Sequence, residues 1–347
     1  MKPVQTGIAS YGMSGSVFHA PFIGSHPMFE IHSIVERTKD VARARYPAAR
    51  TVRSYEAMLS EPDVELVIVN TPDVTHFEFA RMALLAGKHV VVEKPFVFEV
   101  AQGEELIALA KARGLMLAVY QNRRWDGDFL TVRRILEAGL LGRVVEFQSA
   151  YQRYRSHIQA GTWKERADGR VGLTYNLGSH MIDQAVVLFG VPQAVYADID
   201  RLRDQGEVDD YYHLRLIYPH VKVSLRAGYL MREETPRYCI HGTQGSFVKY
   251  GLDPQEEMLK AGLVPGLPRW GAEDEAAWGT LNTEVSGLHF RGKVETVCGN
   301  YGAFYDDIYR SLRDGTPPLT DAAGVLPVIR IIEAAFRSVR EGRAVPV

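Results

Sequence analysis

The chain up to Tyr120 alternates short, mostly apolar runs with longer stretches whose apolar residues recur at helical spacing. The runs are too short for helices and rich in β-branched residues, which predicts buried strands. These strands are Val4–Ala9, Ile31–Val35, Leu66–Asn70, His89–Glu93 and Leu115–Tyr120. The helices predicted between them are Asp40–Tyr46, Tyr55–Ser60, Val74–Ala86 and Val100–Arg113. Apolar strands that alternate with amphipathic helices are typical of a parallel sheet covered on both faces.

The pattern changes after Tyr120. Beyond a helix at Phe129–Ala138, the predicted strands follow one another closely: Val144–Arg155, Val195–Arg203, Tyr211–Tyr218, Val221–Tyr229, Arg237–His241 and Ser246–Tyr250. Strands without intervening helices predict a large, mostly antiparallel sheet. Prolines and glycines in Leu252–Lys293 predict loops, and two helices, Tyr301–Arg313 and Ala322–Glu341, close the chain. The sequence therefore predicts an α/β domain over residues 1–121 and a second, α+β domain over residues 122–347.

Composition removes several classes of function. The 347 residues exceed one ordinary core, and the apolar share of 46% and charged share of 24% are typical of globular proteins. A net charge of −2 without a basic stripe argues against a nucleic-acid partner. No apolar run approaches the roughly 20 residues of a membrane span, and the chain begins with a strand rather than a signal segment. Two cysteines, Cys239 and Cys298, cannot staple such a chain, so we expect a reducing, cytoplasmic location.

The first predicted strand runs into a turn of small residues that opens a helix. The turn reads Ser10-Tyr11-Gly12-Met13-Ser14-Gly15, a G-x-G-x-x-G fingerprint with serine in its first position. Small residues let the chain turn tightly and let its backbone approach a pyrophosphate, while the helix N-terminus supplies N–H groups. We therefore expect the turn, Ser14 excepted, to bind a dinucleotide in a Rossmann domain. The alternative is a purely structural turn.

The end of the second strand bears on the choice of cofactor. Glu36 can accept hydrogen bonds from the adenosine 2′-hydroxyl and repel a 2′-phosphate, which favours NAD. Arg37 follows it and could instead pair with the 2′-phosphate of NADP or stack on adenine. Both residues could also be ordinary charges at a strand end. On sequence alone the cofactor is NAD or NADP, with NAD favoured.

Motifs near the ends of the later strands resemble one known family. They are Thr71, Pro72 and His76; Glu93, Lys94 and Pro95; Asn122–Asp126; and Gly178–Asp183. The chain is similar over its whole length to the glucose–fructose oxidoreductase/inositol dehydrogenase/rhizopine-catabolism (Gfo/Idh/MocA) family, in the subgroup that includes NADP-type scyllo-inositol dehydrogenases. The resemblance implies a nicotinamide-dependent oxidoreductase that acts on a polyhydroxylated sugar or cyclitol.

The resemblance also implies binding residues and an assembly. The cofactor contacts expected beyond the glycine turn and Glu36–Arg37 are Thr71, Pro72, His76, Glu93, Lys94, Asn122, Arg123 and Trp163. The family pairs subunits over the open face of the second domain's sheet, so a homodimer or homotetramer is expected. In this chain the sheet shows alternating apolar positions at Leu214, Leu216, Val221 and Val223.

Four residues are the catalytic candidates. Hydride transfer from a secondary alcohol needs a base for the hydroxyl proton and a positive group beside the developing alkoxide. Lys94 follows a buried parallel strand at its carboxyl end, where ligands bind in such sheets, and it is catalytic in the family. A histidine ordinarily titrates near neutrality, so His180 is the expected base, and Asp183, one helical turn further on, is the expected substrate or orienting contact.

Asn176 departs from the family pattern, which has aspartate at this position. Asparagine keeps the shape and can accept a hydrogen bond, but the negative charge beside the histidine is gone. That loss should lower the basicity of the imidazole. We expect either slower alcohol oxidation or a different substrate; the alternative is a tolerated substitution.

Other interpretations stay open at this point. The charged cluster Asn122–Asp128 could cap the nicotinamide, bind substrate hydroxyls or form an ion-pair knot between domains. A metal site has thin support, because the histidines are scattered. A catalytically silent, dinucleotide-binding sensor is an alternative function, since fold does not determine function. So is a reductase of another carbonyl compound.

Overall fold

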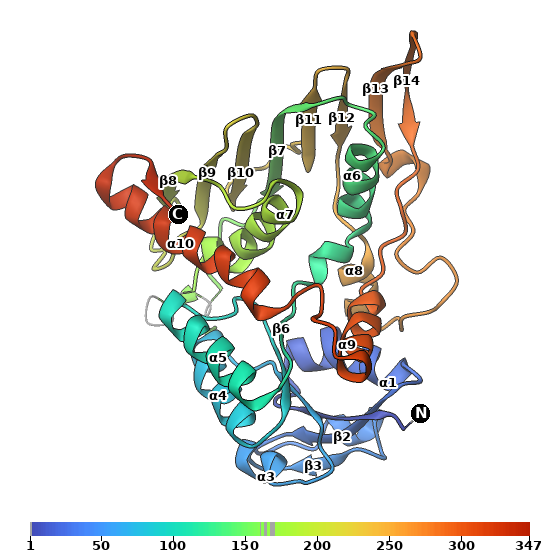
Figure 1. The fold of residues 1–347 in the computed structure, drawn as a ribbon, viewed down its shortest axis with the longest axis vertical. Coiled ribbons are helices and arrows are strands. Elements are labelled where there is room, and N and C mark those ends of the chain that lie inside the picture. Colours follow the sequence, from blue (N-terminus) through green and yellow to red (C-terminus); the bar gives the residue numbers. More distant parts are fainter. Residues whose placement is uncertain (1, 160, 163–164, 167–170) are drawn as a thin grey trace. The chain divides into compact units, whose positions relative to one another are not determined.

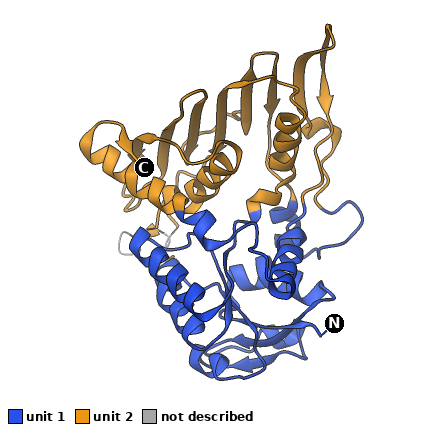
Figure 2. Cartoon of the chain, viewed as in Figure 1, with its two compact units in different colours: residues 1–122, 255–270, 300–326 blue, residues 123–254, 271–299, 327–347 orange. Residues whose placement is uncertain are grey.

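A computed structural model describes residues 2–159, 161–162, 165–166 and 171–347 (Figure 1). Trp163 therefore lies outside the described residues. The chain divides into two compact units (Figure 2). Unit 1 comprises residues 1–122, 255–270 and 300–326, and unit 2 comprises residues 123–254, 271–299 and 327–347. Each unit is thus assembled from separate stretches of the chain.

Unit 1 is built on a six-stranded sheet in the order β3-β2-β1-β4-β5-β6, with every neighbouring pair parallel. The strands are β1 (Val4–Ile8), β2 (Phe29–Val35), β3 (Arg50–Val52), β4 (Leu66–Val69), β5 (His89–Val92) and β6 (Leu117–Val119). All residues of β4 and β6 are buried, because helices cover the sheet. The predicted parallel sheet is confirmed.

The helices of unit 1 are α1 (Ala20–Ser25), α2 (Ala42–Arg45), α3 (Tyr55–Leu59), α4 (His76–Leu85), α5 (Val100–Arg113), α8 (Gln255–Lys260) and α9 (Gly302–Asp314). A π-helical turn, η1 (Ser14–His19), leads into α1. Helices α4 and α5 pack against each other, and α1 packs against both β2 and α9. The last helix, α10 (Ala322–Glu341), begins in unit 1 and continues in unit 2.

Unit 2 is built on a nine-stranded sheet in the order β14-β13-β12-β11-β7-β10-β9-β8-β15. The strands are β7 (Val144–Gln152), β8 (Ala194–Asp200), β9 (Tyr211–Ile217), β10 (Lys222–Gly228), β11 (Tyr238–Gly242), β12 (Gly245–Lys249), β13 (Gly279–Val285), β14 (Leu288–Val294) and β15 (Val345–Pro346). Only the pair β7–β10 is parallel. The helices of this unit are α6 (Gly127–Glu137), α7 (Ser179–Phe189) and the second part of α10. The predicted mostly antiparallel sheet is confirmed.

The interpretation of Leu252–Lys293 as loops is wrong. This stretch contains α8, a 3₁₀ turn at Glu275–Ala277, all of β13 and most of β14. Strand β14 was not predicted, because it lies at the sheet edge and most of its side chains are exposed. A strand without a buried face shows no alternation of apolar and polar residues.

The apolar residues expected to mark the open face of this sheet point the other way. Leu214, Leu216 and Val223 are at most 3% exposed within the single chain, on the side where α7 packs against β10. The opposite face carries polar and charged side chains, including Arg215, Lys222 and Arg226. Among the described residues no helix is long and apolar enough to cross a membrane.

Candidate active site

The glycine turn at the end of β1 is held from β4. The amide of Asn70 accepts from the Ser10 N–H at 3.0 Å and donates to the Ser10 carbonyl at 2.7 Å. The Ser10 hydroxyl accepts from the Gly12 N–H at 3.3 Å. Serine in place of the first fingerprint glycine thus contributes a hydrogen bond inside the turn.

Gly15 is the position in this turn that tolerates no side chain. A Cβ atom there would lie 2.0 Å from the Ser10 carbonyl oxygen and 2.8 Å from the amide nitrogen of Asn70. The backbone therefore passes very close to itself where β1 leads into η1. Such a turn at the carboxyl end of parallel strands, opening into a helix, is the cradle in which Rossmann domains hold a pyrophosphate.

A cavity of about 560 Å³ adjoins the turn in unit 1. This volume suits part of a dinucleotide. Seven of the fifteen predicted cofactor residues line this cavity: Ser10, Tyr11, Gly12, Glu36, Arg37, Thr71 and Pro72. His76 is not among the lining residues, since it is fully buried and bridges the carbonyls of Pro95 and Thr71 at 2.8 and 3.1 Å. We interpret His76 as a residue that holds the two motifs together.

The Glu36 carboxylate does not reach freely into the cavity. It is 7% exposed, and its two oxygens accept from the backbone N–H groups of Val41 and Ala42 at 3.1 and 3.0 Å. The carboxylate thereby satisfies N–H groups at the start of α2. The exposed residues of the segment that lines the cavity are Arg37, Thr38 and Lys39.

Glu93 is the centre of a buried network that reaches Lys94. One carboxylate oxygen accepts from the Ser14 hydroxyl at 2.5 Å and lies 3.1 Å from Nε2 of His19. The other accepts from the Lys94 N–H at 3.0 Å. Nδ1 of His19 lies 2.7 Å from the Tyr305 hydroxyl of α9. The network therefore ties the backbone of Lys94 to the glycine turn and to a helix from the far end of the chain.

The electrostatics of Glu93 follow from these partners. Burial by itself raises the pKa of a carboxyl group, but the hydrogen bond and charge of His19, the charge of Lys94 and the Ser14 hydroxyl outweigh it. Together they lower the pKa of Glu93 to about 2. The group is therefore a fixed negative charge at the pH of a cell. It lies beside Lys94, whose peptide bond to Pro95 is cis.

In unit 2 the other catalytic candidates share one continuous helical segment. Asn176 lies in the π-helical turn η6 (Thr174–Gly178), which runs directly into α7 with His180 and Asp183. His180 is 5% exposed and Asp183 is 1% exposed. Asp183 forms a two-pronged ion pair with Arg124, with distances of 2.7 Å from Nε and 2.6 Å from Nη2. This carboxylate is therefore neutralised and held by its own unit.

The charged stretch that begins at Asn122 forms ion pairs inside unit 2. Besides the Arg124–Asp183 pair, Arg123 lies 3.3 Å from Asp126, and the carbonyl of Arg123 accepts from the side chain of Gln184 on α7 at 2.9 Å. These contacts fasten the segment to the helix of His180. Within the part of the chain that the structure describes, no group of three histidine, cysteine or acidic residues is arranged to hold a metal ion.

Several residues that build these sites are not predicted from the sequence. They include Ser14, His19, Asn70 and Tyr305. His19 had a usable signal, because it is a histidine within the apolar run of residues 17–23, and a histidine buried there needs polar partners. Asn70 had one too, since it is a polar residue at the end of an apolar strand. The partner of Tyr305, His19, lies too far away in sequence to be inferred from a pattern.

The fold and the turn define a Rossmann dinucleotide-binding domain joined to a second domain with a large mixed sheet. Residues 4–121 match the profile of the oxidoreductase family's NAD-binding Rossmann fold, and residues 133–347 match that of its C-terminal alpha/beta domain. The chain belongs to the Gfo/Idh/MocA family, as the motifs predicted.

Relatives match over nearly the full length. The NADP⁺-dependent scyllo-inositol 2-dehydrogenase of Bacillus subtilis is 41% identical over 344 residues, which cover 99% of this chain and 95% of that protein. The crystal structure of a protein from Bacteroides fragilis is 54% identical with a TM-score of 0.93 and covers 100% of both chains. An oxidoreductase from Bacillus cereus is 33% identical with a TM-score of 0.89 and covers 96% of both chains.

Proposed function

We propose that this protein moves a hydride between NADP(H) and a secondary alcohol, or the corresponding ketone, of a sugar or cyclitol. The observation that carries the proposal is the anchoring of Lys94. Its N–H donates to Glu93, and the same carboxylate accepts from Ser14 in the glycine turn. The backbone of Lys94 is thereby held next to a turn shaped for a pyrophosphate. The scyllo-inositol dehydrogenase of Bacillus subtilis supports a polyhydroxylated substrate.

The chain's own residues supply the proton chemistry. A bound nicotinamide supplies or receives the hydride. We assign to the Lys94 ammonium the stabilisation of the developing alkoxide, because a fixed positive charge in a partly buried site is worth more than in water. His180 accepts the hydroxyl proton and returns it, since an imidazole titrates near the working pH.

The neighbours of His180 favour an uncharged, hydroxyl-rich substrate. The carboxylate of Asp183 is neutralised by Arg124, and Asn176 carries no charge. An amide both donates and accepts hydrogen bonds, which suits a hydroxyl group that does the same. Asn176→Asp tests this point on a panel of polyols. A changed rate or a changed range of substrates is expected, and identical kinetics would contradict the assignment.

The cofactor that the cavity favours is NADP(H). On sequence alone Glu36 favours NAD, but both of its carboxylate oxygens already accept hydrogen bonds from the backbone of α2. The side chains left at the cavity include Arg37 and Lys39, which are exposed and positively charged. A 2′-phosphate would find cationic donors there, and the Glu36 carboxylate is already engaged; the other acid that lines the cavity is Glu56.

Fluorescence titration with NADPH and NADH tests the cofactor. We expect the wild type to bind NADPH more tightly. Arg37→Ala should weaken NADPH by about 10- to 100-fold, the worth of a charged hydrogen bond, and leave NADH nearly unchanged. Arg43→Ala is the matched control, because Arg43 is exposed on α2 and does not line the cavity. Tighter binding of NADH by the wild type would overturn the proposal.

Turnover tests the reaction. The absorbance of the reduced nicotinamide is followed with inositols, aldoses and keto-sugars. We expect at least one to react, and Lys94→Met to lower kcat by about a thousandfold with cofactor binding kept within a few-fold. Lys111→Met, on the exposed side of α5, should have no effect. Tight cofactor binding without turnover of any compound would favour the silent sensor instead.

We also propose that a second copy of the chain covers the polar face of the sheet in unit 2. A groove of about 550 Å³ lies on that face, between side chains of β7, β9 and β10 that include Glu146, Arg215 and Arg226. Light scattering coupled to size exclusion checks the expectation. Arg215→Glu together with Arg226→Glu should shift the assembly towards the monomer, and an unchanged mass would contradict this choice of face.

A further inference from the structure

The start of the helical segment with Asn176 and His180 is held by a carboxylate to which neither the motifs nor the family profile assign a role. Asp209 lies just before β9, and one of its oxygens accepts from both the N–H and the hydroxyl of Thr174, each at 2.7 Å. The carbonyl of Asp209 accepts from the Leu173 N–H at 2.9 Å. Three hydrogen bonds thus join residue 209 to the first turn of η6.

Asp209 packs closely against the backbone at Gly172. Gly172 has φ of +141°, and a Cβ atom there would lie 2.0 Å from the second carboxylate oxygen of Asp209. The carbonyl of Gly172 in turn accepts from the Asn176 N–H at 3.0 Å. A further contact follows on the same side, where the Tyr212 hydroxyl lies 2.9 Å from the sulfur of Met181 in α7.

We propose that Asp209 is a positioning residue, which sets the direction of η6 and α7 and thereby the places of Asn176 and His180. Asp209 acts on Asn176 and His180 through Thr174, which is the residue that its carboxylate bonds to. The inference rests on the proposed function in one respect, namely that Asn176 and His180 handle the substrate. A shift of about 1 Å in a catalytic group can cost about a hundredfold in rate.

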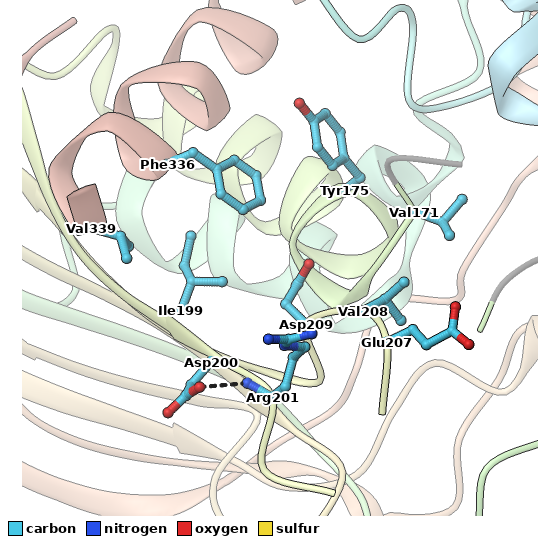
Figure 3. A pocket seen from close by; sticks show the side chains of 10 residues that line it. All are labelled: Val171, Tyr175, Ile199, Asp200, Arg201, Glu207, Val208, Asp209, Phe336 and Val339. Atoms are coloured by element: carbon cyan, nitrogen blue, oxygen red, sulfur yellow. Dashed lines mark hydrogen bonds between the residues drawn. The ribbon is translucent and has the colours of Figure 1, made fainter. Parts of the chain in front are cut away.

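The surroundings of Asp209 determine the pKa of its carboxyl group. It lines a pocket of about 380 Å³, and in Figure 3 its side chain points towards the η6 turn that carries Tyr175. Burial raises the pKa of this carboxyl to about 6 from its ordinary 3.8, against the opposing hydrogen bonds of Thr174, and the neighbouring Asp210 adds to the rise. The charged groups that line the same pocket are Asp200, Arg201 and Glu207.

The sign of this shift gives a sharp expectation. Because the folded state binds the Asp209 proton more tightly than the unfolded chain does, stability from this group falls as pH rises from about 4 through about 6. Ionised Asp209 is therefore a cost to the fold at neutral pH. Asp209→Asn should melt at the same or a higher temperature than the wild type at pH 7.5.

The experiment compares Asp209→Asn with Asp200→Asn, which removes an acid from the same pocket. At pH 7.5 we expect Asp209→Asn to lower kcat about 10- to 100-fold, with the Kd for NADPH unchanged because the cofactor cavity belongs to unit 1. Hydrogen–deuterium exchange should quicken at Thr174–Ser179. Thr174→Val should reproduce part of both effects. Thr174→Ser, which keeps the hydroxyl group, should behave as the wild type. Asp200→Asn should change neither.

Each outcome decides between the two proposals. Unchanged exchange at Thr174–Ser179 in Asp209→Asn would overturn the role of Asp209, whether or not a substrate has been found. So would a kcat that stays constant, or one that falls only in step with the melting temperature. Faster exchange in a protein that turns over none of the tested compounds would leave the anchoring in place and count against the proposed reaction alone.

Discussion

Replacing Glu93 with glutamine removes the charge around which the buried network of unit 1 is organised and keeps the size of the side chain. In the wild type, both carboxylate oxygens accept hydrogen bonds, from Ser14 and His19 on one side and from the Lys94 N–H on the other. A glutamine amide has one oxygen and one NH₂ group. The NH₂ group of the glutamine must therefore face at least one hydrogen-bond donor that the carboxylate oxygen accepted from in the wild type.

The expected loss of stability follows from the pKa. Glu93 has an ordinary value of 4.5 and a folded value of about 2. This difference corresponds to about 3 kcal/mol of stability, which is present above pH 4.5 and is lost as pH falls towards 2. The glutamine variant lacks it at every pH. For a compact unit of the size of unit 1, which contains Glu93, 1 kcal/mol shifts the melting temperature by about 2–4 °C, so unit 1 of the variant should melt roughly 6–12 °C below that of the wild type.

Differential scanning calorimetry from pH 7.5 down to pH 4 measures this effect. The gap between wild type and Glu93→Gln should be largest at neutral pH and should begin to narrow below pH 4.5. Glu105→Gln is the control, because Glu105 makes an exposed ion pair with Arg81 and should shift melting by less than about 2 °C. A Glu93→Gln protein that melts with the wild type at pH 7.5, or a gap that widens on acidification, would refute the reasoning.

Two further predictions concern close packing and buried charge. Gly15→Ala should weaken NADPH binding at least tenfold in a fluorescence titration, because its Cβ atom would lie 2.0 Å from the Ser10 carbonyl oxygen. Gly12→Ala, whose Cβ atom would have its nearest neighbour at 3.6 Å, should leave the melting temperature of the free protein unchanged in calorimetry. Arg124→Met leaves Asp183 buried without its cation and should cost about 3–5 kcal/mol in urea unfolding, while adding Asp183→Asn should recover part of that loss. A double variant no more stable than Arg124→Met alone would show that the ion pair is not the cause.

Local pattern was enough to predict the parallel sheet and the long helices. The helices Val100–Arg113 and Ala322–Glu341 begin and end where the sequence predicts. Their apolar residues recur at helical spacing over several turns, and such a signal is hard to mistake. Predicted boundaries were less good where the signal was short. The helix expected at Asp40–Tyr46 is only Ala42–Arg45, and the strand expected at Val144–Arg155 ends at Gln152.

The parts of the candidate site that the sequence did not reveal depend on side-chain direction or on contacts across the chain. Glu36 stands where an acid would meet a ribose, yet its carboxylate bonds to the backbone of α2. The contact of His19 with Tyr305 joins residues 286 positions apart, and no periodicity within one element can indicate such a pair. Thr174 and Asp209 are likewise brought together only by the packing of η6 beside the start of β9.

Helix α9 has a consequence for the order in which the protein is made. Tyr305 stacks on Phe22, lies edge-on to Phe29 and bonds to His19, so residues near the beginning of the chain find their partners only after position 305 has been synthesised. When only the first 122 residues have emerged from the ribosome, all six strands of the parallel sheet are present, but the apolar side chains that α9 covers, among them Phe22 and Phe29, are exposed. We expect this nascent half to need protection by a chaperone until α9 emerges, and a fragment ending at residue 122 to aggregate when it is expressed alone.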